Sequence, residues 1–160
     1  METNTAQPPH TGEIIEFQLH HRSADNVCVP VHYGIDVSHV REIIKVPAST
    51  PLPEAHPSIL GIFHLREHII PLINLAHWLK AEAGSPAEEK RVIVTQFQEG
   101  FHGFLVDAVN RIYQVCPEHL ESTASFQQTG QRESITSVIR MDDRLIMMLD
   151  FESIIRDTSL

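Results

Sequence analysis

The sequence predicts a mainly β protein built from two similar halves, each forming a small β-barrel, with a hydrophobic core shared between them. Two observations carry this prediction. Apolar and polar residues alternate along much of the chain, which is typical of strands with one buried face. In addition, a unit of strand, tight turn, strand and short helix occurs twice, at residues 59–79 and 135–155. Each half would be marginally stable alone, so the two are expected to bury a common apolar seam.

The first strand is predicted to follow a polar, flexible tail at residues 1–12. Ile15 and Phe17 alternate there with Glu16 and Gln18, so the polar pair is expected on the solvent face.

A second strand is predicted at residues 27–35, where valines and other apolar residues keep one parity. Pro30 has no N–H to donate, which places this strand at a sheet edge or bends it. A third strand at residues 40–46 is followed by the proline-rich connection 47–53.

A β-hairpin is predicted next, with strands at residues 59–65 and 69–73 and a tight turn at 66–68. Asn74 is the expected N-cap of a short helix at residues 75–80, because its side-chain oxygen can accept a backbone N–H.

The second half is predicted to begin after a linker at residues 81–90, which is small, polar and contains glycine and proline. Strands are expected at residues 91–97, 101–106 and 109–115, with a hairpin turn at Glu99-Gly100.

The repeat aligns residues 59–74 with 135–150, so that Asn74 and Asp150 coincide as helix N-caps. Upstream, residues at 37–46 match those at 106–115 in the same way. We therefore expect one domain over residues 13–160, built of halves at about 13–80 and 91–160 that interleave at the seam.

Composition narrows the class of protein. The 160 residues carry 21 acidic and 12 basic side chains, for a net charge of −9, which disfavours a nucleic-acid partner. The N-terminus lacks a signal-peptide pattern and the apolar runs are too short to cross a bilayer, so a cytoplasmic protein is expected. Cys28 and Cys116 lie in apolar stretches and are expected to be buried thiols.

Residues capable of catalysis or metal binding do not gather in a recognisable pattern. His64 and His68 flank a turn without cysteine or acidic ligands at zinc spacing. Glu42, Asp107 and Asp150 lie within apolar patterns, but a strand face, a chain turn and a helix cap explain them. No nucleophile elbow or phosphate-binding loop is present. The sequence therefore predicts a protein that is not an enzyme and uses no metal or cofactor.

Several segments resemble the CheW-like domain family of bacterial chemotaxis, in order and with the family's gaps. The resemblance runs from about Ile14 to Arg156, and the segments around residues 56–66 look similar to the form of the domain found in CheV, where a receiver domain follows. The matching segments are residues 40–44, 51–53, 61–66, 70–75, 103–109 and 149–151.

The resemblance implies two five-stranded, SH3-like barrels around a shared core. It also implies a non-catalytic adaptor that links chemoreceptor cytoplasmic tips to the regulatory domain of the histidine kinase CheA, at receptor arrays on the membrane. In the family, receptors bind the groove between the barrels and the kinase binds the barrel ends. Two alternatives stay open: an adaptor of another chemosensory pathway such as pilus motility, or the N-terminal part of a CheV.

Eight positions match family residues implicated in partner contact or its support. Glu42 falls in a V-x-E element, and Arg66 is expected either to pair with an acidic receptor helix or to cap strand carbonyls. The glycines are expected at a bulge or a close backbone approach. The eight are Val40, Glu42, Gly61, Arg66, Gly103, Val106, Asp107 and Val109.

One position departs from the family pattern. Glu67 stands where the family has a glycine after the arginine. If this turn position needs a positive φ, glutamate would cost about 1–2 kcal/mol there, so the turn is expected to differ in type.

Overall fold

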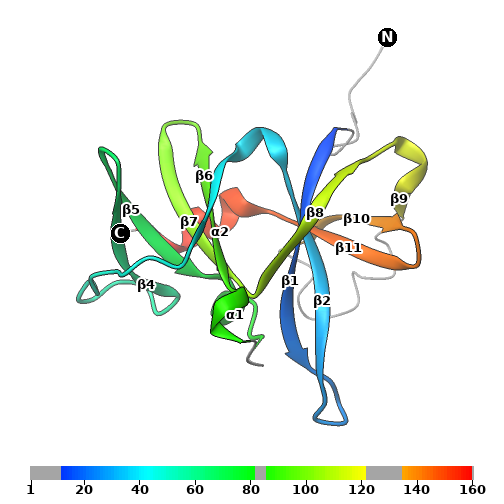
Figure 1. Ribbon diagram of the computed structural model, residues 1–160, viewed down its shortest axis with the longest axis horizontal. Coiled ribbons are helices and arrows are strands. Elements are labelled where there is room, and N and C mark those ends of the chain that lie inside the picture. The colour runs from blue at the N-terminus through cyan, green and yellow to red at the C-terminus, as the bar shows by residue number, and fades with distance from the viewer. Residues whose placement is uncertain (1–11, 82–85, 122–134, 160) are drawn as a thin grey trace.

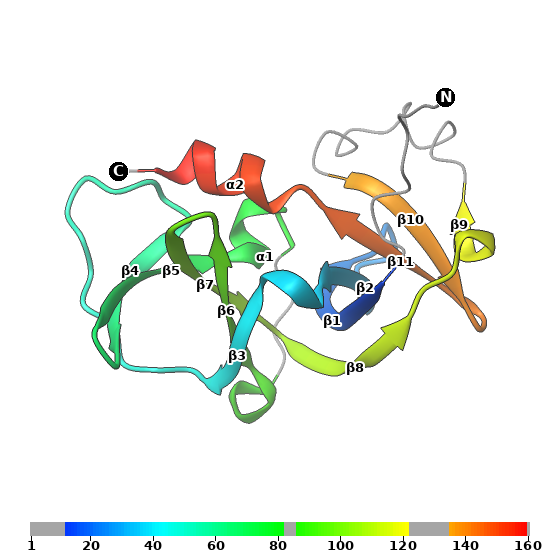
Figure 2. The same ribbon diagram turned by 90° about the horizontal axis from the view of Figure 1, so that it is seen from above.

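The computed structural model describes residues 12–81, 86–121 and 135–159. Within them the chain is mainly β, with two sheets and short helices (Figures 1 and 2). One sheet has six strands in the order β8-β1-β2-β11-β10-β9, and the other has five in the order β3-β6-β7-β5-β4. We refer to them as the six-stranded and the five-stranded sheet.

The strand bounds agree closely with those predicted from hydrophobic alternation. The six-stranded sheet contains β1 (Glu13–Arg22), β2 (Cys28–Asp36), β8 (Ala108–Gln114), β9 (Leu120–Glu121), β10 (Ile135–Met141) and β11 (Arg144–Leu149). The five-stranded sheet contains β3 (Val40–Lys45), β4 (Ile59–Leu65), β5 (His68–Asn74), β6 (Arg91–Phe97) and β7 (Gly100–Val106). The helices are α1 (Leu75–Trp78), α2 (Phe151–Thr158) and the single 3-10 turns η1 (Val37–His39), η2 (Ala87–Glu89) and η3 (Pro117–His119).

Each sheet takes strands from both halves of the chain. Strand β3 follows β2 in sequence but pairs with β6, and β8 follows β7 but pairs with β1. The chain therefore crosses from one sheet to the other between β2 and β3 and again between β7 and β8, as Figure 2 shows. Residues far apart in the sequence meet at this junction.

Three hydrophobic clusters explain why both sheets have two buried faces. The central cluster receives Phe17 and Ile35 from one sheet, Ile93 and Phe104 from the other, and Phe151 from α2. The opposite face of the six-stranded sheet packs a second cluster, and that of the five-stranded sheet a third. The second cluster contains Ile14, Tyr113, Val115, Ile139, Met141, Ile146 and Met148, and the third contains Phe63, Ile70, Leu72, Val92 and Val94.

The internal repeat is reproduced in the hairpins and helices. The β4–β5 hairpin pairs Ile59 with Ile73 and shifts register before Gly61, and the β10–β11 hairpin has the same irregularity at the equivalent residues. Both expected N-caps are present: the Asn74 side chain accepts from the N–H of His77 at 3.3 Å, and that of Asp150 from Ser153 at 3.1 Å. Helix α1 ends earlier than predicted, at Trp78.

Strand β2 is not a sheet edge overall, but Pro30 lies in a part of it that is. Strand β11 pairs with β2 only at His32–Gly34, whereas β1 pairs along its whole length. The missing N–H of Pro30 is therefore not needed by a neighbouring strand.

Two expectations about burial are wrong. Glu16 was expected on a solvent face but is 0% exposed, because the second cluster covers the face of β1 that the alternation suggested was open. Cys28 is exposed and Cys116 half-buried. Cys28 begins β2 opposite Arg22, at the hairpin end that extends beyond β11, so its apolar neighbours do not indicate burial.

The turn containing Glu67 does not place that residue in a left-handed conformation. The residue with positive φ is Arg66, at 55°, and the equivalent first turn residue of the other hairpin, Asp142, has φ 56°. The glutamate is therefore accommodated without the strain considered for this position.

Two half-buried histidines make stability depend on pH. Burial lowers the pKa of His102 below 6.5, and burial likewise lowers the pKa of His21, against an opposing effect of Asp107. A lowered pKa in the folded state means that the unfolded chain binds protons more readily below pH 6.5. The contribution of these two histidines to the free energy of unfolding is thus fully present above pH 6.5 and is lost as the pH falls through their folded-state pKa values.

We expect His102→Gln to reduce this acid sensitivity. The measurement is chemical unfolding of both proteins at several pH values between 8 and about 5. If the pH slope of the free energy of unfolding is the same in the variant, burial of His102 does not contribute to it.

Candidate functional site

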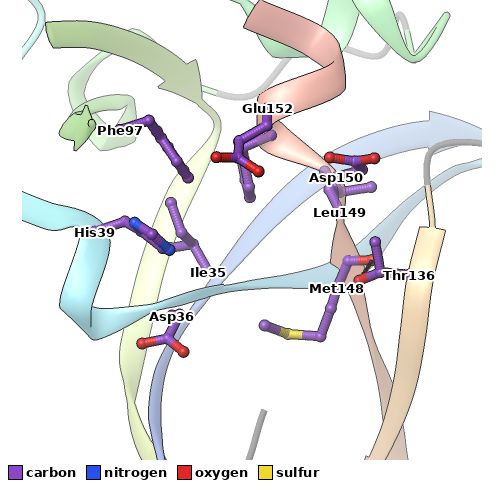
Figure 3. Close-up of a pocket in the computed structure, with 10 residues that line it drawn as sticks. Ile35, Asp36, His39, Phe97, Thr136, Met148, Leu149, Asp150 and Glu152 are labelled. Atoms are coloured by element: carbon purple, nitrogen blue, oxygen red, sulfur yellow. Dashed lines mark hydrogen bonds between the residues drawn. The ribbon is translucent and has the colours of Figure 1, made fainter. Parts of the chain in front are cut away.

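A groove of about 260 Å³ opens where the two sheets meet the start of α2 (Figure 3). It lies beside the end of β2, the turn η1, the end of β6 and the strands β10 and β11. Its apolar lining consists of Ile35, Phe97, Met148, Leu149 and Phe151, and its polar lining of Asp36, His39, Thr136, Asp150 and Glu152.

Local capping fixes two of the groove's carboxylates. Asp36 accepts the N–H of Ser38 at 2.9 Å as the N-cap of η1, and Asp150 is the N-cap of α2. Each cap uses one side-chain oxygen, which satisfies an N–H that the helix leaves unpaired. The caps therefore hold both carboxylates at the groove, and Glu152 in the first turn of α2 adds a third.

An aromatic pair forms another side of the groove. The rings of His39 and Phe97 stack with centroids 4.2 Å apart and an angle of 18° between their planes. Phe97 also lies against Phe151, at 6.2 Å between centroids. The pair belongs to the five-stranded sheet and its connection, so the groove has walls from both sheets.

Glu42 and Arg66 are brought together across 24 residues of sequence. Glu42 lies on β3, Arg66 lies in the β4–β5 turn, and their side chains form an ion pair. The side chain of Arg66 is 71% exposed and that of Glu42 is 28% exposed. Such a solvated pair adds roughly 0–1 kcal/mol to stability, so both charges are available to a partner.

Val40 and Val109 are partly buried and pack against the central cluster. They lie at the starts of β3 and β8, the two strands that follow the crossings between the sheets. Both therefore belong to the junction of the two sheets.

Four of the eight predicted positions are buried. Val106 belongs to the central cluster. Asp107 turns the chain between β7 and β8, and its Oδ2 accepts the N–H of His20 at 2.8 Å. Gly61 and Gly103 are the other two buried positions.

Both glycines lie where a side chain would collide with a neighbour. A Cβ at Gly61 would come within 2.4 Å of the carbonyl oxygen of Thr50, which confirms the close backbone approach expected there. A Cβ at Gly103 would lie 2.9 Å from Val92 and 3.0 Å from Phe63, inside the third cluster. These glycines are needed by the fold.

Local sequence indicates neither the groove as a site nor a buried polar network, although Asp150 is recognisable as a helix cap. His39, Phe97 and Glu152 have no local pattern that distinguishes them from other surface residues, because they come together only through the sheet topology. Within the second cluster, Arg144 forms two contacts to the Glu16 carboxylate, at 2.9 and 3.1 Å. The only available signal was a charged residue, Glu16, inside an apolar strand.

Other kinds of site find no support in the described residues. Residues 12–81, 86–121 and 135–159 contain no group of three or more histidine, cysteine, aspartate or glutamate side chains arranged to hold a metal ion. Over the same ranges, no helix is long and apolar enough to cross a membrane.

Comparison with known proteins identifies the family. The sequence matches the CheW-like domain over residues 24–159. It is 36% identical over 152 residues to the chemotaxis protein CheV3 of Helicobacter pylori, covering 92% of this chain and 48% of CheV3. It is 28% identical over 126 residues to a probable chemotaxis protein CheW of Rhizobium etli, covering 79% of this chain and 81% of that protein. The chain thus spans about half the length of CheV3.

A solved structure has the same fold. The crystal structure of the scaffolding protein TtCheW from Thermoanaerobacter tengcongensis superposes with a TM-score of 0.73 and 24% sequence identity, covering 88% of this chain and 89% of that one. Strand topology, internal repeat and sequence match agree, and the chain belongs to the CheW-like domain family.

Proposed function

We propose that this protein is a non-catalytic chemotaxis scaffold that couples the cytoplasmic tip of a chemoreceptor to the regulatory domain of the histidine kinase CheA. The groove between the two sheets carries the proposal, because its apolar floor and charged rim suit a protein segment. At 260 Å³ it is smaller than most small-molecule sites, which span roughly 300–1,000 Å³. The proposed location is the cytoplasm, at receptor arrays.

We assign the receptor tip to the groove and its flanks, and the kinase domain to the outer ends of the sheets. Glu42, Arg66, Val40 and Val109 are the proposed contact residues among the eight matched positions. The other four support those contacts from the interior: Gly61, Gly103, Val106 and Asp107. In this proposal residues 13–160 act as one domain, and each sheet curves into an SH3-like barrel around its own cluster, with the short β9 as a sixth strand in one of them where the resemblance implied five.

The test is a calorimetric titration of the full chain with the purified CheA regulatory domain and, separately, with a receptor signalling tip. Glu42→Lys and Arg66→Ala are each expected to weaken binding of the titrated partner roughly tenfold. The free energy of unfolding should change by less than about 1 kcal/mol, because a solvated ion pair contributes little to stability. Arg41→Ala, a nearby exposed arginine that bonds Gln96 at 2.7 Å, is the control.

Binding to neither partner would contradict the proposed function. Equal losses of stability and affinity in the Glu42 and Arg66 variants would show that these residues act on the fold.

A second candidate is a role as the CheW-like part of a CheV. The observation that favours it is the 36% identity to CheV3 over half of that protein. A scaffold of another chemosensory pathway is a variant of the same proposal, and capture of a different receptor from lysate by the tagged chain would distinguish it.

A further inference from the structure

We propose that the groove receives an arginine side chain presented on an apolar surface of the receptor tip. This deepens the proposed function and rests on it for the identity of the partner.

The lining of the groove contains three carboxylates and no lysine or arginine. Asp36, Asp150 and Glu152 line it, and in the described parts of the chain none of the three forms an ion pair with a lysine or arginine. The caps of η1 and α2 use one oxygen each of Asp36 and Asp150, so each retains an oxygen that can accept from a ligand. The charge therefore favours a cationic group.

The groove is also shaped for an apolar stem and a flat head. Ile35, Met148 and Leu149 provide an apolar floor, and the stacked rings of His39 and Phe97 provide an aromatic wall (Figure 3). Arginine combines an aliphatic stem with a planar guanidinium that stacks on aromatic rings and donates in a fixed fork to carboxylates. A volume of about 260 Å³ suits one side chain better than a whole ligand.

The overall negative charge of the chain is not sufficient to explain why this groove would bind arginine. A net charge of −9 attracts any cation weakly and over a wide surface. The groove differs in placing three carboxylates around an apolar floor, where water is partly excluded and a charged hydrogen bond is stronger. Binding should therefore depend on these three residues and not on acidic residues elsewhere.

The first measurement uses Nα-acetyl-L-arginine amide as the probe and its neutral isostere, the citrulline analogue, as the comparison. Methyl NMR signals of Ile35 and Met148 report binding at the floor of the groove. We expect saturable shifts with the arginine probe and binding at least about tenfold weaker with citrulline. Equal shifts with both probes, or none with arginine, would overturn the inference.

The second measurement removes the charge but keeps the fold. In the triple variant Asp36→Asn, Asp150→Asn and Glu152→Gln, asparagine preserves both helix caps, since it caps as well as aspartate. A control with the same change in net charge replaces three exposed acidic residues away from the groove: Asp25→Asn, Glu88→Gln and Glu89→Gln. We expect the groove variant to lose at least tenfold in affinity for the arginine probe and for the receptor tip, and the control to change by less than threefold.

The results of these measurements distinguish a failure of the arginine site from a failure of the proposed scaffold function. A receptor tip that binds the wild type and the groove variant equally would leave the proposed function standing and overturn the arginine site. A tip that does not bind the wild type would contradict the proposed function, and the arginine probe would then decide the inference alone.

Discussion

Replacing Arg144 by leucine is expected to lower the free energy of unfolding by about 3 kcal/mol. The guanidinium of Arg144 contacts both oxygens of Glu16 and lies 2.5 Å from the hydroxyl of Tyr113. Since Glu16 is 0% exposed, removing its cationic partner leaves a buried carboxylate without its main compensation. Breaking such a pair from one side costs roughly 3–5 kcal/mol.

His32 contributes to the same network but does not replace the arginine. Its Nδ1 lies 2.6 Å from Oε2 of Glu16 and balances the charge only when the ring is protonated. A guanidinium, in contrast, is always charged in proteins. The measurement is urea unfolding of wild type and variant under the same buffer conditions.

A neighbouring arginine gives the matched control. Arg140 on β10 pairs with Glu121 at 2.9 Å, with side chains 62% and 32% exposed. Arg140→Leu is expected to cost less than about 1 kcal/mol, because a solvated pair contributes little. Equal losses in the two variants would show that burial of Glu16 is not what makes Arg144 important.

The internal repeat suggests how to restore stability. Through the pairings of Glu16 with Gly34 and of Val94 with Gly103, the equivalent of Glu16 in the other half is Val94. Glu16→Val combined with Arg144→Leu is expected to recover most of the loss, because apolar replacements of a buried pair are often neutral or stabilising. A double variant no more stable than Arg144→Leu alone would mean that the second cluster cannot accommodate valine.

Glu16 also shows where prediction from the sequence ends. Alternation on β1 correctly indicated a strand and the inward side of Ile15 and Phe17, because the central cluster needs only one parity. It could not reveal that the other parity faces the second cluster, since that cluster is completed by β8, β10 and β11. Strand positions follow from local pattern, whereas the number of buried faces follows from long-range topology.

The same distinction between local pattern and long-range topology applies to the candidate site. The caps Asn74 and Asp150 were predictable because a cap needs only a polar side chain at a helix start. That Asp150 also lines a groove with Asp36 and Phe97 was not, since parallel pairing of β11 with β2 brings these segments together. The Glu42–Arg66 pair was partly foreseen, as two residues singled out by resemblance but not as a contact.

Gly61→Ala is expected to destabilise the protein by about 3 kcal/mol. The added Cβ would lie 2.4 Å from the carbonyl oxygen and 2.8 Å from the carbonyl carbon of Thr50, so backbone must move. Thr50 and Ile62 exchange two backbone hydrogen bonds at this point, of 2.8 and 2.9 Å. Overpacking costs about 1–3 kcal/mol and each lost hydrogen bond about 1 kcal/mol, which together give the expected loss.

The structural effect of Gly61→Ala should be confined to β4 and its bridge to Thr50. This strand pairs with β5 on one side, and the bridge from Thr50 to Ile62 covers part of its other edge. In the variant, amide hydrogens of Ile62 and Thr50 should exchange faster than those of β6 and β7, and the uncovered edge should promote self-association. Gly100→Ala is the control: the nearest atom to its Cβ would be Cε1 of the His102 ring at 3.2 Å, on a side chain that can shift, and the carbonyl oxygen of Phe97 at 3.8 Å is in ordinary contact, so we expect a loss below about 1 kcal/mol. If both alanine variants lose stability equally, the contact with Thr50 does not govern the effect, and the restriction of the unfolded chain cannot explain the loss either, because it would stabilise the protein.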